Sequence, residues 1–74
     1  MYRVTRKQKI VQGGNLIEFE DSQVFGSRVA ANAAAAKILS IEILSGYQWY
    51  GPDKVIFESP TFYRSVTVTI EEIK

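Results

Sequence analysis

The sequence contains no cysteine and no histidine. Without cysteine, the chain can form neither a disulfide bond nor a thiolate metal site. Without histidine, it lacks the side chain that most often acts as a general base or binds a transition metal. We therefore expect the protein to bind no metal and no cofactor.

Long apolar runs and a strong charge of one sign are also missing. Nine Lys and Arg against eight Asp and Glu give a net charge of +1, so the total charge does not favour a polyanion. No apolar run approaches the roughly 20 residues of a membrane span, and the first residues lack the apolar core of a signal peptide. We expect a soluble protein of the cytoplasm.

Motifs for a phosphate-binding loop or a serine nucleophile do not occur in the chain. Glu18 and Glu20 could approach a metal from one strand face, but Lys9 and Lys7 match them across a predicted hairpin. The glutamates at 71–72 are adjacent, so a strand would point them to opposite faces. We expect the protein not to be an enzyme.

The first 20 residues predict a β-hairpin. Residues 2–11 alternate between apolar and polar, which is typical of a strand, and residues 16–20 (LIEFE) form the second strand. The two glycines at 13–14 suit a two-residue turn, because this turn needs positive φ at both central positions. The resulting register places Lys9 opposite Glu18, an opposite-charge pair that stabilises a sheet.

The alanine-rich segment 29–37 (VAANAAAAK) predicts a helix, with Ser27 as one residue able to cap it. The end of this helix is open. Residues 38–44 (ILSIEIL) alternate as in a strand and are rich in isoleucine. However, no turn separates them from the alanines, and Gly46 suits a helix C-cap. A helix to about residue 44 is slightly favoured over a break near Lys37.

The rest of the chain predicts three further strands. Two of them flank a turn at 52–53 (PD), in a register that places Tyr50 opposite Val55. The third strand alternates over 61–73 and is the longest, which predicts a central position. The expected fold is a single α+β domain over 1–74. It has an antiparallel sheet with one helix packed on it, in the order β-β-α-β-β-β.

Three aromatic residues, Tyr47, Trp49 and Tyr50, precede the 52–53 turn. Because Tyr50 and Val55 are expected under the helix, alternation puts Tyr47 and Trp49 on the face away from the helix. There they either shield the second face of the sheet or form a contact patch, since Trp and Tyr dominate interface energetics. Both interpretations stay open.

The predicted helix is apolar on several sides, and Ala34, Ile38 and Ile41 lie along one of them. One small sheet can cover only one side of a helix, and a helix apolar on several sides is normally buried on several sides. We therefore predict that these three residues contact a second copy of the chain or another protein.

Together these patterns favour a non-enzymatic protein-binding module, such as an adaptor, an inhibitor or a homo-oligomeric accessory protein. Its predicted contact residues are Ala34, Ile38, Ile41, Tyr47 and Trp49. The alternative is a nucleic-acid-binding protein that uses the basic first strand and the aromatic rings. Its predicted contact residues are Arg3, Arg6 and Lys7.

Overall fold

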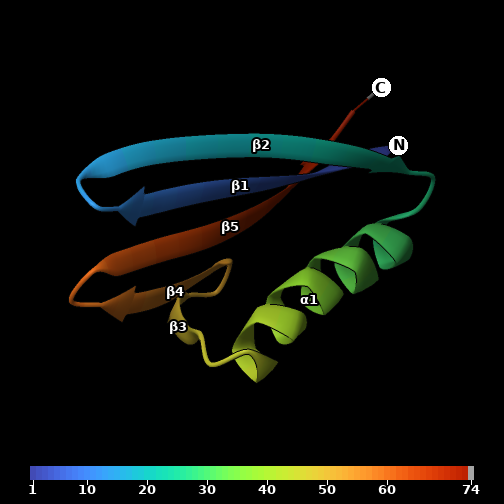
Figure 1. Ribbon diagram of the computed structural model, residues 1–74. Helices are drawn as coiled ribbons and strands as arrows, with labels where there is room; N and C mark the ends of the chain where they lie inside the picture. Colours follow the sequence, from blue (N-terminus) through green and yellow to red (C-terminus); the bar gives the residue numbers. More distant parts are fainter. Residues whose placement is uncertain (74) are drawn as a thin grey trace.

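The computed structural model describes residues 1–73 and places one α-helix on a five-stranded antiparallel sheet (Figure 1). The elements are β1 (Tyr2–Gln12), β2 (Asn15–Phe25), α1 (Arg28–Leu44), β3 (Gln48–Gly51), β4 (Lys54–Ser59) and β5 (Phe62–Glu72). The strands lie in the order β2-β1-β5-β4-β3. The α+β class, the order of elements and the central position of β5 are therefore confirmed.

The first hairpin has the predicted turn and register. Gly13 and Gly14 have φ of 58° and 81°, the positive values that a residue with a side chain adopts poorly. Lys9 pairs with Glu18, as expected. However, β2 does not end at residue 20. It continues to Phe25, because β1 supplies a pairing partner for every residue over that length.

The helix is continuous from Arg28 to Leu44, so the alternative break near Lys37 is wrong. The Ser27 Oγ caps its first turn by accepting a hydrogen bond from the Ala30 N–H at 3.1 Å. At the other end Gly46 has φ of 98°, which lets the chain turn away from the helix axis. The helix thus continues through the isoleucines and ends just before Gly46, where the chain can reverse.

The core lies between α1 and the middle of the sheet. It consists of Val4, Ala31, Ala35, Leu39, Val55, Val66 and Val68. The helix contributes small residues from one stripe, which lets its backbone approach the valines of β1, β4 and β5 closely. Val55 and Val66 are the largest of these side chains to be fully buried, so the core is thin.

The β3–β4 hairpin differs from its predicted register by one residue. Trp49, and not Tyr50, pairs with Val55, and the register shifts between Trp49 and Gly51. Such a β-bulge places one extra residue on one strand, which changes the face to which the preceding residues point. The predicted pairing of Tyr50 with Val55 is therefore wrong.

This shift also reverses the predicted faces of the aromatic residues. Trp49 shares the helix-bearing face with its partner Val55, since directly opposite residues point to one side of a sheet. Tyr47 packs against the core on the same side. Tyr50 instead lies beside Lys54, whose Nζ is 5.0 Å from its ring centroid. The expectation that Tyr47 and Trp49 face away from the helix is wrong.

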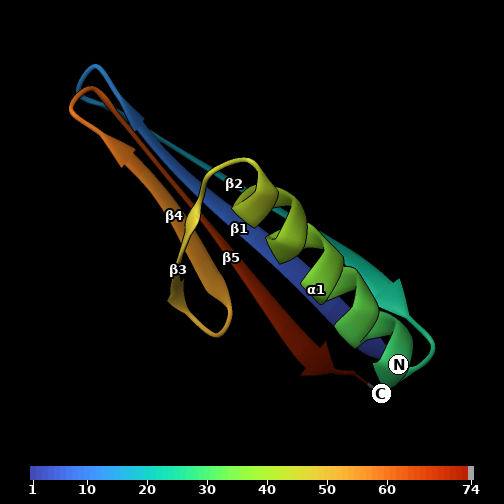
Figure 2. The ribbon, with the colours of Figure 1, turned by 90° about the horizontal axis from the view of Figure 1, so that it is seen from below.

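The helix covers only one end of its face of the sheet. Seen edge on, α1 lies on one side, and the turns of the β1–β2 and β4–β5 hairpins extend beyond its C-terminal end (Figure 2). The strands reach further because three of them have 11 residues in extended conformation, whereas α1 rises only about 1.5 Å per residue. Part of one sheet face is left without a covering layer.

Candidate functional site

Strand pairing brings apolar residues together on the uncovered part of the helix-bearing face. One row across the sheet reads Phe19, Gln8, Val66, Val55 and Trp49, and the next reads Ile17, Ile10, Arg64 and Phe57. Phe62, opposite Gln12, follows nearer the turns. We call the set Ile10, Ile17, Phe19, Trp49, Phe57 and Phe62 the open face.

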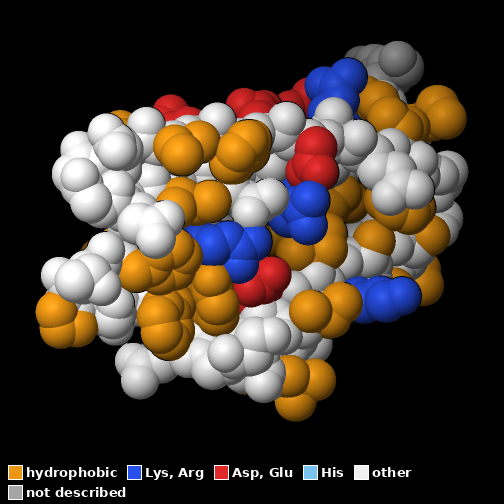
Figure 3. Space-filling model, viewed as in Figure 1, with side chains coloured by type: hydrophobic (Ala, Val, Ile, Leu, Met, Phe, Trp, Pro, Cys, Tyr) orange, Lys and Arg blue, Asp and Glu red, His pale blue; other side chains and the backbone are white. Residues whose placement is uncertain are grey.

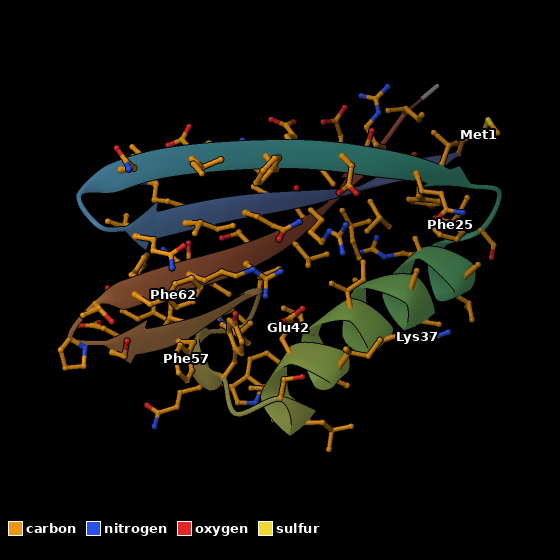
Figure 4. All side chains as sticks on the ribbon, viewed as in Figure 1. Met1, Phe25, Lys37, Glu42, Phe57 and Phe62 are labelled. Carbon is orange, nitrogen blue, oxygen red and sulfur yellow. The ribbon has the colours of Figure 1, made fainter. Side chains whose placement is uncertain are left out.

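The open face is accessible to solvent. The exposed fractions are 48% for Ile17, 54% for Phe19, 56% for Trp49 and 37% for Phe57. Hydrophobic side chains gather at the end of the face that the helix leaves uncovered, on the left of the view, next to a few charged groups (Figure 3). Phe57 and Phe62 lie on neighbouring strands beyond the end of the helix (Figure 4). All five strands thus contribute apolar side chains to this face, with Gln8 and Arg64 between them.

A polar cluster stands where the helix ends and the open face begins. The Arg64 Nη1 donates to the Glu42 Oε2 and to the Tyr47 hydroxyl, both at 2.8 Å, and the Arg64 Nε donates to the Gln8 Oε1 at 3.2 Å. The Arg64 and Glu42 side chains are only 20% and 14% exposed. Arg64 therefore joins β5 to β1, to α1 and to the segment before β3.

The guanidinium of Arg64 stays charged in this environment. Burial lowers its pKa, but the hydrogen bonds to Tyr47 and Glu42 and the Glu42 charge raise it by more, so the pKa lies above its ordinary value. The Glu42 carboxylate balances this charge at short range. The cluster is consequently a closed ion pair and offers no free positive charge to an anion.

The same cluster orders the aromatic part of the open face. The Tyr47 ring lies against Phe57 with centroids 5.6 Å apart, and Phe57 lies against Phe62 at 6.0 Å. The Arg64 guanidinium lies 5.4 Å from the Tyr47 ring centroid and also bonds its hydroxyl. Because Arg64 holds the Tyr47 end of this row and each ring contacts the next, the row loses little conformational entropy when a partner covers it.

The helix residues that were expected to contact a partner have different environments. Ala34 and Ile38 are half-buried and line a groove of about 290 Å³ beside β1 and β2. Ile38 also packs against the core. Ile41 is 51% exposed. The sequence-predicted stripe is thus divided between the chain's own sheet and solvent.

The stripe that does face the sheet was not singled out from the sequence. Ala31, Ala35 and Leu39 are buried at a spacing of four residues, and Glu42 follows on the same side with Arg64 as its partner. This spacing is present in the sequence, but the alanines at neighbouring positions form other apolar stripes along the helix, so the sequence does not show which stripe is buried. Arg64 was missed as well, because nothing local to residue 64 shows that Glu42 lies opposite.

The three basic residues of the nucleic-acid alternative do not form one surface. Arg6 lies on the helix-bearing face and pairs with Asp21, with its Nη2 2.7 Å from the Oδ2. Arg3 and Lys7 lie on the opposite face, where Arg3 is 3.6 Å from Glu71. Lys7 instead lines a shallow hollow of about 500 Å³ on that face.

Among residues 1–73, no three His, Cys, Asp or Glu side chains are grouped closely enough to hold a metal ion. No helix in this part of the chain has the length and apolar character needed to cross a membrane. No family model, curated protein or solved structure matches the sequence or the fold. The arrangement of the chain's own residues is thus the basis for any functional proposal.

Proposed function

We propose that the protein is a non-enzymatic protein-binding module of the cytoplasm, an adaptor, an inhibitor or a homo-oligomeric accessory protein. The observation that carries this proposal is the open face: apolar residues from all five strands, left uncovered on one side of the sheet. Exposed apolar side chains gathered on one face mark interaction sites in soluble proteins.

Trp49 and Phe57 are the proposed anchors of the contact. Large aromatic side chains and arginine carry most of the binding energy of protein interfaces, usually near the centre of the contact. Here the ordered row of Tyr47, Phe57 and Phe62 lies next to Arg64 and its hydrogen bonds. Ala34, Ile38 and Ile41 stay a proposed second contact, in which Ile41 is the most accessible residue.

The test compares Phe57→Lys with Val29→Lys, a control on the helix at a side chain that is 80% exposed. Each variant and the wild type serve as immobilised bait in a quantitative capture experiment, and light scattering gives the mass of each in solution. We expect a specific protein, or a second copy, to be retained by the wild type and by Val29→Lys and lost by Phe57→Lys. Trp49→Lys repeats the test at a second anchor if Phe57→Lys unfolds.

Equal capture by all the folded variants, together with a monomeric mass for each, would show that the open face is not a contact surface. Thermal melts followed by circular dichroism establish that each variant is folded before this comparison is made. Loss of the partner in a folded Phe57→Lys variant cannot then be attributed to unfolding.

A second candidate function is nucleic-acid binding on the face away from the helix. The observation that favours it is the hollow in which Lys7, Lys9 and Lys54 meet Tyr63 and Ser65, although Glu18 and Glu20 also line it. Lysines with an aromatic ring are the parts of a surface that tracks a single strand. Binding of single-stranded oligonucleotides that weakens steeply with salt, and is lost in Lys7→Glu, would favour this function. Absence of binding at low salt would reject it.

A further inference from the structure

The two edges of the sheet are built differently. The edge strand β3 has four residues, a bulge and a proline turn after it, which are features that prevent pairing with another chain. The edge strand β2 has 11 residues, no proline and an unbroken register with β1. Residues 15–24 are all exposed, and no helix or strand among residues 1–73 lies beyond β2 (Figure 1). A long, regular edge of this kind is a template for another strand.

The backbone groups that β2 presents at this edge follow from the hairpin turn. The turn at 13–14 makes Gln12 and Asn15 a hydrogen-bonded pair, and bonded and non-bonded pairs alternate along an antiparallel ladder. Every second residue of β2 therefore directs its N–H and C=O away from β1. These residues are Leu16, Glu18, Glu20, Ser22 and Val24.

The side chains along β2 select the chemistry of an added strand. Glu18 and Glu20 lie on the face away from the helix, whereas Ile17 and Phe19 belong to the open face. The strand has three acidic residues and no basic one. An added strand would therefore bring basic side chains to one face and apolar side chains to the other.

Strand β1, which pairs with the other side of β2, already places a basic side chain beside Glu18 and an apolar one beside Ile17. Lys9 lies opposite Glu18, and Ile10 lies opposite Ile17. The Lys9 Nζ is 4.0 Å from the Glu18 Oε1, with both side chains more than half exposed, so this contact is weak. Glu18 thus retains the capacity to accept a second cation from the outer side.

A second copy of the chain fits this edge poorly. Two β2 strands related by a two-fold axis overlap most when the axis passes through Phe19, Glu20 or Asp21, near the middle of the strand. An axis at Phe19 places Glu18 opposite Glu20 of the second copy. An axis at Glu20 or at Asp21 places that residue opposite the same residue of the second copy. Like charges directly opposite one another destabilise a strand pair. The edge therefore favours a partner of opposite charge.

We propose that β2 binds, edge to edge, an extended segment of another protein in which basic residues alternate with apolar ones. The basic side chains lie beside Glu18 and Glu20, and the apolar ones lie beside Ile17 and Phe19. The inference rests on the proposed protein-binding function and specifies the chemistry of the partner.

The probe is a fluorescein-labelled peptide with blocked ends and the sequence TRKQKIV, which copies residues 5–11. Fluorescence anisotropy measures its affinity, and amide chemical shifts of the protein locate the site. We expect saturable binding, with the shifts concentrated in β2, that weakens as ionic strength rises to about 1 M, where screening acts over about 3 Å. The matched peptide TREQEIV reverses the charge at both lysines and should not bind.

Ser22→Pro tests whether the backbone of the edge is used. This substitution removes an outward N–H and leaves the bonds to β1 in place, as proline is tolerated on the solvent side of an edge strand. Losing one such hydrogen bond should raise the Kd of TRKQKIV about tenfold. Ser22→Thr is the control and should bind as the wild type does. If Ser22→Pro unfolds, Glu18→Gln with Glu20→Gln replaces it and should abolish the salt dependence.

Three results would each overturn the proposal: no saturable binding of TRKQKIV, equal binding of TREQEIV, or an affinity that the folded Ser22→Pro variant leaves unchanged. Val29→Lys lies on the helix, outside both proposed contacts, and should leave peptide binding unaltered. If the peptide fails to bind while Phe57→Lys still loses a captured partner, the edge proposal falls and the proposed function stands. If the peptide binds β2 while Phe57→Lys still captures the partner, the open face is not the contact site.

Discussion

Replacing Arg64 with methionine should destabilise the protein more than most single substitutions. Methionine keeps much of the length of the side chain but removes every hydrogen bond that the guanidinium donates. Glu42, only 14% exposed, would then lose the guanidinium that pairs with it. The Tyr47 hydroxyl and the Gln8 amide would also lose their donor.

The magnitude follows from the burial of the pair. Removing one partner of a buried ion pair costs about 3–5 kcal/mol. Because Arg64 and Glu42 retain some exposure, we expect the lower end, about 3 kcal/mol. A domain of 74 residues has a free energy of unfolding of about 4–11 kcal/mol, at about 0.05–0.15 kcal/mol per residue. The substitution would therefore remove a large share of the stability.

Urea unfolding followed by circular dichroism measures this change. With a slope near 1 kcal/mol per M for a chain of this size, the midpoint should fall by about 3 M. Arg64→Met combined with Glu42→Met should recover most of the loss, because an apolar pair leaves no buried charge. A loss under about 0.5 kcal/mol in Arg64→Met, within the range of ordinary surface substitutions, would refute the reasoning. So would a double variant that is less stable than Arg64→Met.

Three further predictions concern the fold and are measured by thermal or urea unfolding. Gly14→Val should cost about 1–3 kcal/mol because φ is 81° there, whereas Gly26→Val, at a residue without positive φ, should cost clearly less; equal losses would contradict this. Ser27→Ala should cost about 1 kcal/mol through loss of the N-cap, and an unchanged midpoint would argue against the cap. Leu39→Ala should cost about 2–5 kcal/mol, whereas Ile41→Lys should change stability by under about 0.5 kcal/mol. A similar loss at both would mean that Ile41 is not exposed.

The features that could be predicted from the sequence are those that depend on neighbouring residues. The glycines at 13–14 determine the turn, the turn determines the register, and the register brings Lys9 to Glu18. The helix over 29–37 follows from alanine propensity in the same way. Each of these needs only contacts within about one hairpin or a few helical turns.

The features that were missed depend on contacts between distant segments. The bulge near Tyr50 changes the face of Trp49, and it forms where β4 is held in register by β5. Arg64 and Glu42 are 22 positions apart and meet only because α1 crosses the sheet at that angle. The choice of Ala31 and Leu39 as the buried stripe likewise requires knowledge of where the sheet lies. Alternation alone assigns faces correctly only while the register is unbroken.

The central position of β5 has a consequence for the order of folding. Of the five described strands it comes last in the chain, yet it lies between β1 and β4, and its residue Glu72 pairs with Tyr2 of β1. The Ile73 N–H even donates to the Met1 carbonyl at 2.8 Å. The β1–β2 hairpin can close early from local contacts, but the inner edge of β1 has no partner until β5 leaves the ribosome. Pairing across so long a loop is slow, so we expect the joining of the two hairpins to limit the folding rate.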